Sequence, residues 1–483
     1  MRKFSMKNIA AVAALQLALM AGFTSCSDDD KAPSYSTAAV SNSELMTILK
    51  AKGYQFNEQG NLLLDDKATS TTSLDLSGTK ISQKALAELN ILPNLTDVNL
   101  SNNGYGPVFH VDSLPAQIKG LDLQGNEIYD FEGLVDAKVV NDEVVATVLH
   151  PFNKLYLPAS CKYNVEDLMP FYTASNTESR ATANSVDMKM VNDKGTLETY
   201  NTLREIPDEY FRKYLKSKFS SIFTADNKLD ISKPLALAER GGNILLQYDT
   251  DYENIFDIQS LEGLEYFINN PYLQSYYIFI SIKKELPFSL AGRLMPNTNV
   301  TGLVLENVNT ISGIDCSKAT NLSAIGFSNN PSLVSLNLTK TAFLNQDIKD
   351  FNASAMMFNS LSCKDCENLE EISISKSSYN ITQKVVLANL PKLKSIDLKK
   401  IEGISTLALC QIPLCDISYP TSLKYVYYGS ENIIEEISED NQIDFAISQE
   451  VKDMESTKNF LDKYYDFLNN DKRSFRTYKA VNF

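Results

Sequence analysis

The 483-residue sequence contains two histidines and no tryptophan, so side chains for imidazole catalysis, metal capture or indole sugar platforms are scarce. His110 and His150 lie 40 residues apart, and neither begins an H-E-x-x-H or similar ligand motif. With 19 glycines in the whole chain, no G-x-S-x-G elbow, Walker loop or G-x-G-x-x-G motif occurs. These absences favour recognition over chemistry. We expect a protein that is not an enzyme and that uses no cofactor and no metal.

The sequence also has fewer basic than acidic residues. Lys and Arg total 45 against 60 Asp and Glu, which gives a net charge of -15 and a pI near 4.8. A protein that binds nucleic acid needs a positive surface to release counterions, so we expect no nucleic-acid partner. Apolar residues make up 43% of the chain and charged residues 22%, a balance typical of globular proteins. The length suits about two or three domains.

The first 26 residues have the pattern of an export signal. Arg2, Lys3 and Lys7 precede an apolar stretch at 9–23, which is shorter than the roughly 20 residues that span a bilayer. Small residues stand directly before Cys26, which resembles the lipobox of bacterial lipoproteins. The resemblance implies that Cys26 is lipidated and becomes the new N-terminus. The alternative is a secreted protein with an ordinary cleavage site and an incidental cysteine.

The acidic run at 27–31 follows Cys26 directly. It is similar to the export signal of surface-exposed lipoproteins in the Bacteroidetes. This resemblance implies a chain that is anchored in outer-membrane lipid through Cys26 and faces the cell exterior. Residues 26–40 then form a flexible tether between the lipid and the folded part. The Ser-x-x-Glu sequence at 41–44 predicts a capping box that starts a short helix.

Three early segments share the frame L-x-x-L-x-L-x-x-N, with threonine at the outer positions of the first segment. Their strand centres are Leu74, Val98 and Leu121, spaced 24 and 23 residues apart. This is the pattern and the period of leucine-rich repeats. In such a frame an inward asparagine, here Asn103 and Asn126, can satisfy backbone groups where the chain turns. A further strand is expected at Leu155 and Leu157.

A second repetitive block has an 11-residue spacing. Its strand centres are Leu303, Ile314, Ile325 and Leu336, then Leu361 and Ile372, then Val385, Ile396 and Leu407. An 11-residue period can also indicate a right-handed helical supercoil, but the L-x-L alternation and the turn sequence "SNNPS" favour strands. Two such elevens make a 22-residue coil with an extended segment on each side. The stretch "ISGIDCSKATNLSAIGFSNNPSLVSLNLTKT" resembles the leucine-rich repeats of Bacteroidetes surface proteins.

These observations predict an α+β repeat solenoid, rich in β-structure, in two leucine-rich-repeat modules with helical caps. The stretch "IPDEYFRKYLKSKF" at 206–219 resembles the N-terminal cap of a bacterial leucine-rich-repeat family, without the carboxylates of that family's calcium loop. The expected divisions are 1–25 signal peptide, 26–40 lipidated tether, 41–171 first module, 172–202 linker, 203–299 helical cap and insertion, 300–428 second module, and 429–483 C-terminal helical cap.

Two groups of residues are candidates for ligand or metal binding. Tyr425 and Tyr427 should both point outward from their strand, which suits stacking on a sugar or peptide, unless they support the C-terminal helix. Asp249, Asp251 and Glu253 alternate in "YDTDYEN", the best carboxylate cluster for a hard cation such as Ca²⁺. The bidentate glutamate expected at the end of a calcium loop is missing. A solvated acidic loop is therefore the default interpretation.

The remaining candidates are interpreted as core. Cys363 and Cys366 form the C-x-x-C motif of the chain, but they occupy inward repeat positions, as Cys316 does, and are expected to be buried thiols. Six cysteines in the chain after Cys26 do not suggest a disulfide scaffold, although an exported location would permit bridges. The segment around Tyr277 and Phe279 is interpreted as a strand buried on both faces.

The sequence thus predicts non-catalytic recognition at the bacterial surface, with a protein, peptide or glycan bound on a repeat face. A structural role, as a subunit of a surface or adhesive assembly, remains the alternative. A hydrolase is the third and least favoured option.

Overall fold

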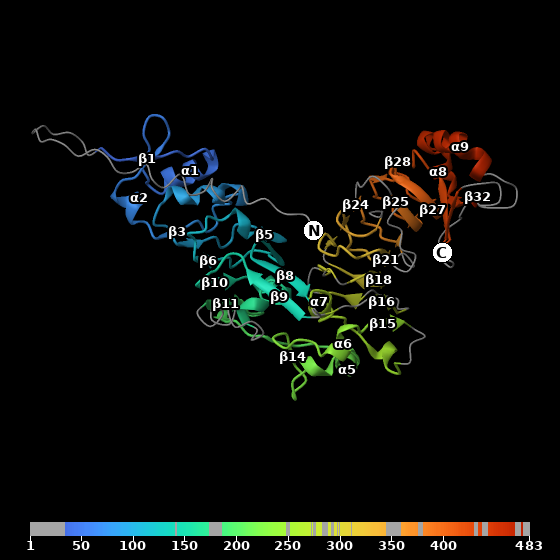
Figure 1. The fold of residues 1–483 in the computed structure, drawn as a ribbon, viewed down its shortest axis with the longest axis horizontal. Helices are drawn as coiled ribbons and strands as arrows, with labels where there is room; N and C mark the ends of the chain where they lie inside the picture. Colours follow the sequence, from blue (N-terminus) through green and yellow to red (C-terminus); the bar gives the residue numbers. More distant parts are fainter. Residues whose placement is uncertain are drawn as a thin grey trace, which may run out of the picture.

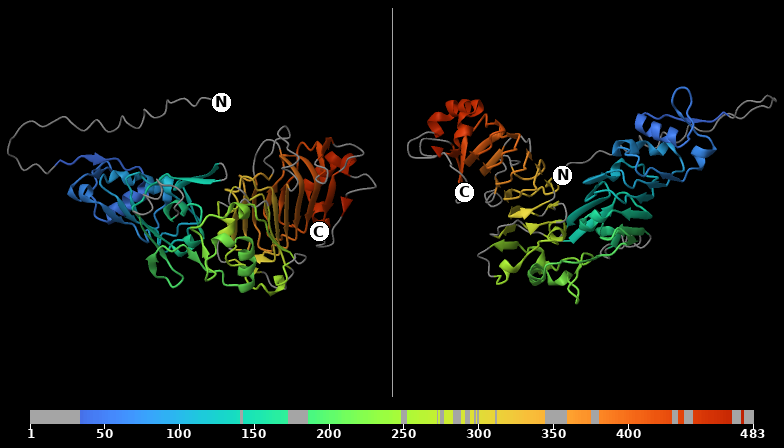
Figure 2. Two further views of the ribbon diagram at one scale, coloured as in Figure 1. Left: turned by 60° about the horizontal axis from the view of Figure 1, so that its bottom comes forward. Right: turned by 180° about the vertical axis from the view of Figure 1, so that it is seen from behind.

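The computed structural model describes residues 34–140, 143–172, 186–247, 252–271, 273, 277–282, 288–290, 294–296, 298, 300–310, 312–343, 359–374, 380–428, 433–436, 443–468 and 475–476. The predicted export signal, Cys26 and the acidic run lie outside these residues. Figure 1 shows two stacks of strands that form the arms of a V and meet near the green helices α5–α7, and the rear view in Figure 2 agrees.

The first stack is built on a sheet with the strand order β12-β11-β10-β6-β4-β3. These strands are β3 Ser73–Asp75, β4 Asp97–Asn99, β6 Gly120–Asp122, β10 Lys154–Leu157, β11 Asp187–Val191 and β12 Leu197–Thr199. The predicted strand centres pair in parallel, Leu74 with Val98 and Val98 with Leu121. Leu155 continues the column opposite Leu121. All four are buried, as an inward-facing strand column requires.

Short helices and turns form the other side of the first stack. They are α1 Ser43–Ala51, α2 Asp66–Ser70, η1 Gln83–Ile91, η2 Val111–Ser113, η3 Ala159–Tyr163 and α3 Met169–Tyr172. Small two-stranded pairs accompany them: β1 Thr37–Ala38 with β2 Leu62–Leu63, β5 Val108–His110 with β7 Asp130–Glu132, and β8 Val135–Val140 with β9 Glu143–Val148.

Helix α1 begins one residue later than the predicted capping box. Asn42 is the N-cap, and its side-chain oxygen accepts from the Leu45 N–H at 3.0 Å. The two box residues have other partners: Ser41 N–H donates to Glu88 at 2.9 Å, and Glu44 accepts from the Ser82 hydroxyl at 2.6 Å. The capping-box prediction is therefore wrong, because contacts with the next segment replace the local exchange.

The inward asparagines satisfy backbone groups as predicted. Asn103 Nδ2 donates to the carbonyls of Leu76 at 3.0 Å and Leu100 at 2.9 Å. Asn126 Nδ2 donates to Leu100 at 3.1 Å and Leu123 at 2.8 Å, and its oxygen accepts from the Asn103 N–H at 3.1 Å. Each amide therefore joins neighbouring strand segments and gives a hydrogen bond to carbonyl groups that would otherwise be buried without a partner.

The predicted linker at 172–202 is wrong in its second half. Strand β11 pairs in parallel with β10, with Leu155 opposite Met188, and β12 turns back antiparallel to it. Residues 187–199 thus belong to the first sheet, while 173–185 lie outside the described residues. The polar composition of residues 187–199 concealed both strands, because β12 is the edge strand of the sheet and edge strands are less buried.

A helical segment connects the two stacks. It contains β13 Leu203–Arg204, α5 Glu209–Lys218, η4 Ser220–Ile222, β14 Leu229–Asp230, α6 Leu237–Arg240, η5 Ile255–Asp257 and α7 Glu265–Ile268. Helix α5 forms as predicted, and Asp208 caps it by accepting from the Phe211 N–H at 2.8 Å. Its apolar face is buried through Phe211, Tyr214 and Leu215, so this segment joins the core of the second stack.

The second stack has two sheets on opposite sides of one core. The long sheet has the order β15-β16-β18-β21-β23-β25-β27-β29-β30, with β31 also paired to β27. Its strands are β15 Ile244–Gln247, β16 Ile278–Ser281, β18 Gly302–Glu306, β21 Ala324–Ser328, β23 Ser360–Lys364, β25 Asn380–Ala388, β27 Ile401–Cys410, β29 Tyr425–Tyr428, β30 Ile433–Glu436 and β31 Asp444–Ile447. The short sheet comprises β20 Gly313–Asp315, β22 Ser335–Leu338, β24 Glu371–Ile374, β26 Ser395–Asp397 and β28 Asp416–Ser418.

The predicted 11-residue spacing places alternate strand centres in the two sheets. In the long sheet Leu303 pairs with Ile325 and Ile325 with Leu361, in parallel register. In the short sheet Ile314 pairs with Leu336. Strands at these predicted centres are therefore confirmed, and they alternate between two sheets. The predicted limits of this module are too narrow, since β15 and β16 precede residue 300 and β31 follows residue 428.

A ladder of left-handed residues, which the sequence reading did not identify, lies where the chain leaves the long sheet. Asn307, Asn329, Asp365, Asn389 and Gln411 all have φ between 51° and 57°. Their side chains bond between neighbouring coils, with Asn329 Nδ2 donating to Asn307 Oδ1 at 2.7 Å and Asn389 Nδ2 to Asp365 Oδ1 at 2.8 Å. Asn and Asp tolerate the left-handed backbone region better than other non-glycine residues, because their short polar side chains can form hydrogen bonds there.

The C-terminal region adds strands as well as the predicted helix. Helices α8 Gln449–Asp453 and α9 Glu455–Leu468 follow β31, and β32 Phe475–Arg476 pairs with β31. Phe460 of α9 stacks on Tyr419 with a centroid distance of 4.5 Å, which attaches the helix to the end of the stack. The predicted C-terminal helix is thus present as α9. Among the helices that the structure describes, none has the length and apolar character needed to cross a bilayer.

The two stacks meet through polar and aromatic contacts. Lys318 of the second stack forms ion pairs with Asp130 and, at 3.6 Å, with Asp167 of the first. Tyr163 stacks on Tyr266 with a centroid distance of 5.5 Å. We call Lys318, Asp130 and Asp167 the junction cluster.

Candidate functional site

The predicted aromatic pair at Tyr425 and Tyr427 does not form an exposed surface. Tyr427 is 0% exposed, and burial raises its pKa. Tyr425 is half-buried, and Val426 between them faces the core. The prediction that both rings point into solvent is therefore wrong for Tyr427. The strand frame correctly separates inward from outward side chains, but it does not show that the outward face of β29 is covered at Tyr427.

Half-buried aromatic rings lie instead on β16 and immediately before it. Ile278, Ile280 and Ile282 are fully buried, whereas Tyr277 and Phe279 on the opposite face are partly exposed. The two rings stack with a centroid distance of 5.8 Å and an interplanar angle of 18°. The prediction of a strand buried on both faces is therefore wrong. One face of β16 is open, and it presents an aromatic surface to the outside of the long sheet.

This aromatic surface forms one end of a groove of about 430 Å³. The groove runs across the outer face of the long sheet from β16 to β31. At about 4.8 Å between neighbouring strands, the groove is about 29 Å long. Parallel register aligns one row of its floor, with Val304 opposite Gly326 and Gly326 opposite Ser362. A Cβ at Gly326 would lie 3.1 Å from Val304 Cγ1. The floor of the groove is therefore low at Gly326, which lies close to the aromatic end of the groove.

Hydroxyl and charged groups line the rest of the groove, which we call the long-sheet groove. The hydroxyl residues are Ser328, Ser360, Ser362 and Thr406, and the charged residues are Glu306, Lys364, Lys384 and Asp444. Partial desolvation and the neighbouring charge of Lys364 lower the pKa of Lys384. Glu306 accepts a hydrogen bond from Ser281 beside the aromatic end. Apolar rings and several polar groups in one elongated hollow are typical of ligand sites.

A second hollow, of about 730 Å³, lies on the short sheet. Two of its acidic side chains have partners: Glu370 pairs with Lys394, and Glu371 accepts from the Ser373 hydroxyl at 2.7 Å. Its apolar lining includes Ile372 and Ile374, which are already largely buried in the core. The hollow is larger than the long-sheet groove, but its lining offers aliphatic, hydroxyl and charged groups without an aromatic surface. The long-sheet groove is therefore the better candidate for a ligand.

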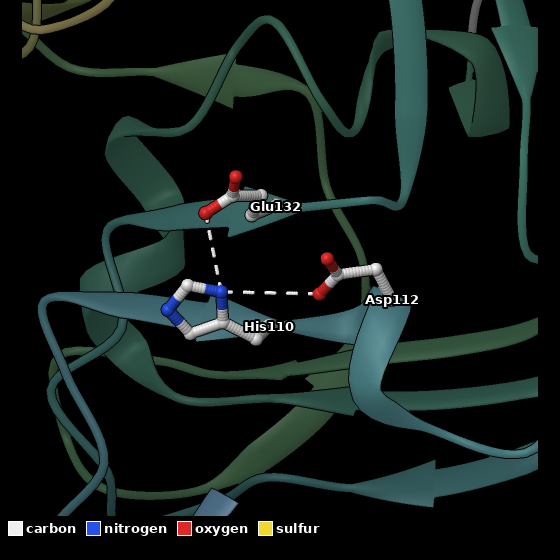
Figure 3. Close-up of side chains that lie close together, drawn as sticks. All are labelled: His110, Asp112 and Glu132. Atoms are coloured by element: carbon white, nitrogen blue, oxygen red, sulfur yellow. Dashed lines mark ion pairs between the residues drawn. The ribbon is translucent and has the colours of Figure 1, made fainter. Parts of the chain in front are cut away.

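One histidine lies in a cluster of potential metal ligands on the first stack (Figure 3). His110 Nδ1 is 3.1 Å from Glu132 Oε2 and 3.8 Å from Asp112 Oδ1. One ligand atom from each residue lies within 4.8 Å of the other two, and all three residues are exposed. The sequence reading considered His110 only with His150. It missed Glu132, which stands 22 residues after His110, about one coil further along the chain.

His150 has a different environment. Its Nε2 is 2.8 Å from the Ile118 carbonyl oxygen, its ring stacks on Phe152, and burial lowers its pKa. These contacts place His150 in a structural role. Of the predicted calcium candidates, Asp249 and Asp251 lie outside the described residues, and Glu253 is exposed.

The cysteines occupy the core positions predicted for them. Cys316 and Cys363 are 0% exposed, Cys366 is also buried, and burial raises the pKa of the Cys363 thiol. Cys366 Sγ lies 3.3 Å from the Lys364 carbonyl oxygen. The six described cysteines form no disulfide bond with one another, and all six are buried. Buried neutral thiols are poor nucleophiles and poor metal ligands, which agrees with a packing role.

The chain matches no protein-family model, no curated protein and no solved structure. Functional conclusions therefore depend on the chemistry of the long-sheet groove and of the His110 cluster.

Proposed function

We propose that this protein is a lipid-anchored leucine-rich-repeat protein of the bacterial surface that binds a glycan in the long-sheet groove without transforming it. The observation that carries the proposal is the groove itself, an elongated hollow with stacked aromatic rings at one end and hydroxyl and ammonium groups along its length. Its strands recur at the coil period, so the same outer face is presented from coil to coil.

The lining suits a sugar for a chemical reason. The C–H faces of a sugar ring pack on aromatic side chains, while its hydroxyl groups need hydrogen-bond donors and acceptors at the edge of the ring. Tyr277 and Phe279 offer the first kind of surface. Ser362 and Thr406 offer the second kind, and the ammonium groups of Lys364 and Lys384 add charge-assisted donors. An extended peptide is the other occupant of this length, and the experiment below separates the two.

The surface location rests on the N-terminal sequence. Basic residues, a short apolar stretch and small residues before Cys26 resemble a lipoprotein signal, and the acidic run that follows is similar to a surface-export signal. Removal of residues 1–25 deletes three positive charges and changes the net charge from -15 to -18, which keeps such a chain soluble outside the cell. Cys26 would then hold the protein in outer-membrane lipid, with the repeat faces directed away from the cell.

The test is glycan-array binding by the full chain in detergent, with affinities then measured for the best glycan. Phe279→Ala removes one ring of the aromatic surface, and Phe256→Ala is the matched control because Phe256 is an exposed ring (56%) outside the groove. We expect Phe279→Ala to weaken binding at least about 10-fold, which corresponds to about 1.4 kcal/mol, and Phe256→Ala to leave it unchanged.

Because Phe279 is half-buried, a second variant keeps the test independent of folding. Ser362→Tyr inserts a ring into the groove floor and should abolish binding while thermal unfolding stays near that of the wild type. Binding of peptides but no glycan would contradict the proposed ligand class. A stoichiometric envelope protein that co-purifies with the chain, together with wild-type behaviour of both groove variants, would favour the structural-subunit alternative.

A further inference from the structure

We propose that His110, Asp112 and Glu132 form a binding site for a divalent transition-metal ion on the first stack (Figure 3). The site is separate from the long-sheet groove, and the proposal does not depend on the proposed function. One imidazole nitrogen and two carboxylate oxygens are a ligand set that Zn²⁺ and related ions accept. The imidazole distinguishes this cluster from a purely acidic surface patch, because Ca²⁺ and Mg²⁺ prefer oxygen ligands.

The distances between the ligand atoms fit such an ion. In a tetrahedral zinc site with bonds of about 2.0–2.1 Å, neighbouring ligand atoms lie about 3.3 Å apart. His110 Nδ1 is 3.1 Å from the Glu132 oxygen and 3.8 Å from the Asp112 oxygen. The three atoms lie within 4.8 Å of one another, so small rotations of the side chains would bring all of them to bonding distance. Two carboxylates beside the imidazole also supply the negative charge that attracts a dication.

The backbone holds the three residues in place. Strands β5 and β7 pair in parallel, with His110 directly opposite Glu132. Both side chains therefore project from the same face of the two-stranded sheet. Asp112 follows in η2, two residues after His110. Gly133 packs against it: a Cβ at Gly133, whose φ is +79°, would lie 2.5 Å from Asp112 Cβ. A glycine at this position is therefore what allows the Asp112 and Glu132 segments to approach so closely.

A residue of the preceding coil restrains the β5 strand that carries His110. Gln83 Oε1 accepts from the His110 N–H at 2.6 Å, and Gln83 Nε2 donates to the Val108 carbonyl at 3.0 Å. The Ser113 hydroxyl donates to the His110 carbonyl at 2.6 Å. Ligands on restrained segments lose less freedom when they bind an ion, which favours binding. Since all three side chains are exposed, the remaining coordination positions are open to water or to a ligand from another molecule.

The experiment uses the purified full chain in detergent, titrated with ZnCl₂ at pH 7 and followed by calorimetry and by NMR of ¹³C-labelled histidine. The chain has two histidines, so the spectrum contains one site signal, from His110, and one internal reference, from His150. We expect one equivalent of Zn²⁺ to shift the His110 signal and leave the buried His150 signal in place. CaCl₂ at the same concentration should shift neither.

Three variants assign the ligands. His110→Ala and Glu132→Gln should each weaken Zn²⁺ binding at least about 10-fold, and Asp112→Asn should do the same. Glu58→Gln is the matched control, because it removes an exposed carboxylate elsewhere on the same stack. This variant should bind Zn²⁺ with the affinity of the wild type. A His110 signal that Zn²⁺ leaves unchanged, or wild-type affinity in His110→Ala, would overturn the proposal. Circular dichroism of each variant verifies that the fold is retained, as expected for exposed side chains.

Discussion

Replacing Lys318 with methionine should weaken the junction of the two stacks. Asp130 and Asp167 are buried, with 9% and 5% of their side chains exposed, whereas the Lys318 side chain keeps 31%. Asp167 also accepts from Asn164 Nδ2 at 2.7 Å and from the Phe131 N–H at 3.1 Å. Lys318→Met keeps most of the aliphatic volume but removes the cation. It therefore leaves two buried carboxyl groups without their counter-charge.

The expected cost follows from the burial of the carboxyl groups. Removing one partner of a buried ion pair costs about 3–5 kcal/mol, and the partial exposure of Lys318 favours the lower end, about 3 kcal/mol. Asp130→Asn removes one of the two acidic groups, so it should restore part of the loss when combined with Lys318→Met. An interaction free energy of at least about 1 kcal/mol is expected between the two positions. Lys394→Met, which breaks an exposed pair with Glu370, is the matched control and should have no measurable effect.

The pH dependence of the loss has a defined sign. Burial by itself would raise the pKa of Asp167, but the charge of Lys318 and hydrogen bonds from neighbouring groups outweigh it and lower that pKa. A lowered carboxyl pKa contributes stability above the ordinary value of about 3.9, and this stability is lost as the pH falls through the folded-state value. Burial and the charge of Asp167 raise the pKa of Asp130, which acts in the opposite direction. The difference between wild type and Lys318→Met should therefore shrink as Asp167 becomes protonated in both proteins.

Hydrogen exchange of the full chain measures this effect where it arises. In Lys318→Met the amides at 129–131 and 163–167 should exchange faster at pH 7, while amides near Leu74 remain protected, because each coil contacts mainly its neighbours. Denaturant unfolding supplies the free energies. Exchange of the amides at 129–131 and 163–167 at the wild-type rate in Lys318→Met at neutral pH would refute the argument. A difference in unfolding free energy that is the same at pH 3 and pH 7 would also refute it.

Three further predictions concern the repeat frame and the N-terminus. Leu336→Ala should cost about 2–5 kcal/mol by denaturant unfolding, because Leu336 is 1% exposed in the core, whereas Ser335→Ala on the other face of β22 should stay within about 0.5 kcal/mol; equal effects would contradict the inward and outward assignment. Cys26→Ala should abolish partitioning into the detergent phase, and unchanged partitioning would exclude the lipid anchor. Alanines at 28–30 should retain the lipoprotein on the periplasmic side, so digestion by protease added to whole cells would show that the acidic run is only a spacer.

Local patterns in the sequence predicted the elements that depend on neighbouring residues. The alternation of apolar side chains located the strand centres, and the 11-residue spacing placed Ile325 in one sheet and Leu336 in the other. The frame predicts the hydrogen-bonding role of Asn103, and the apolar face of the segment predicts helix α5, which Asp208 caps. These features follow from the periodicity of a strand or helix, which a sequence displays directly.

Exposure at the candidate binding surface was decided by tertiary structure. Tyr427 and Phe279 both alternate with core residues, yet Tyr427 is fully buried and Phe279 lines the long-sheet groove. Alternation along a strand separates one face from the other, but it contains no information about what covers the outer face. Depth in the fold depends on segments that pack from elsewhere in the chain.

Contacts between coils and between the two stacks could also not be predicted from local sequence patterns. His110 meets Glu132 because parallel register places the residues of adjacent coils side by side, and Lys318 meets Asp130 across 188 residues of sequence. The capping box at Ser41 failed for the same reason, since Glu88 of a later segment bonds Ser41 instead. The spacing of the strand centres and the inward side chains could be predicted from the sequence, because both follow from local geometry. Only the folded chain decided which polar groups of different coils meet, because that depends on how the coils stack.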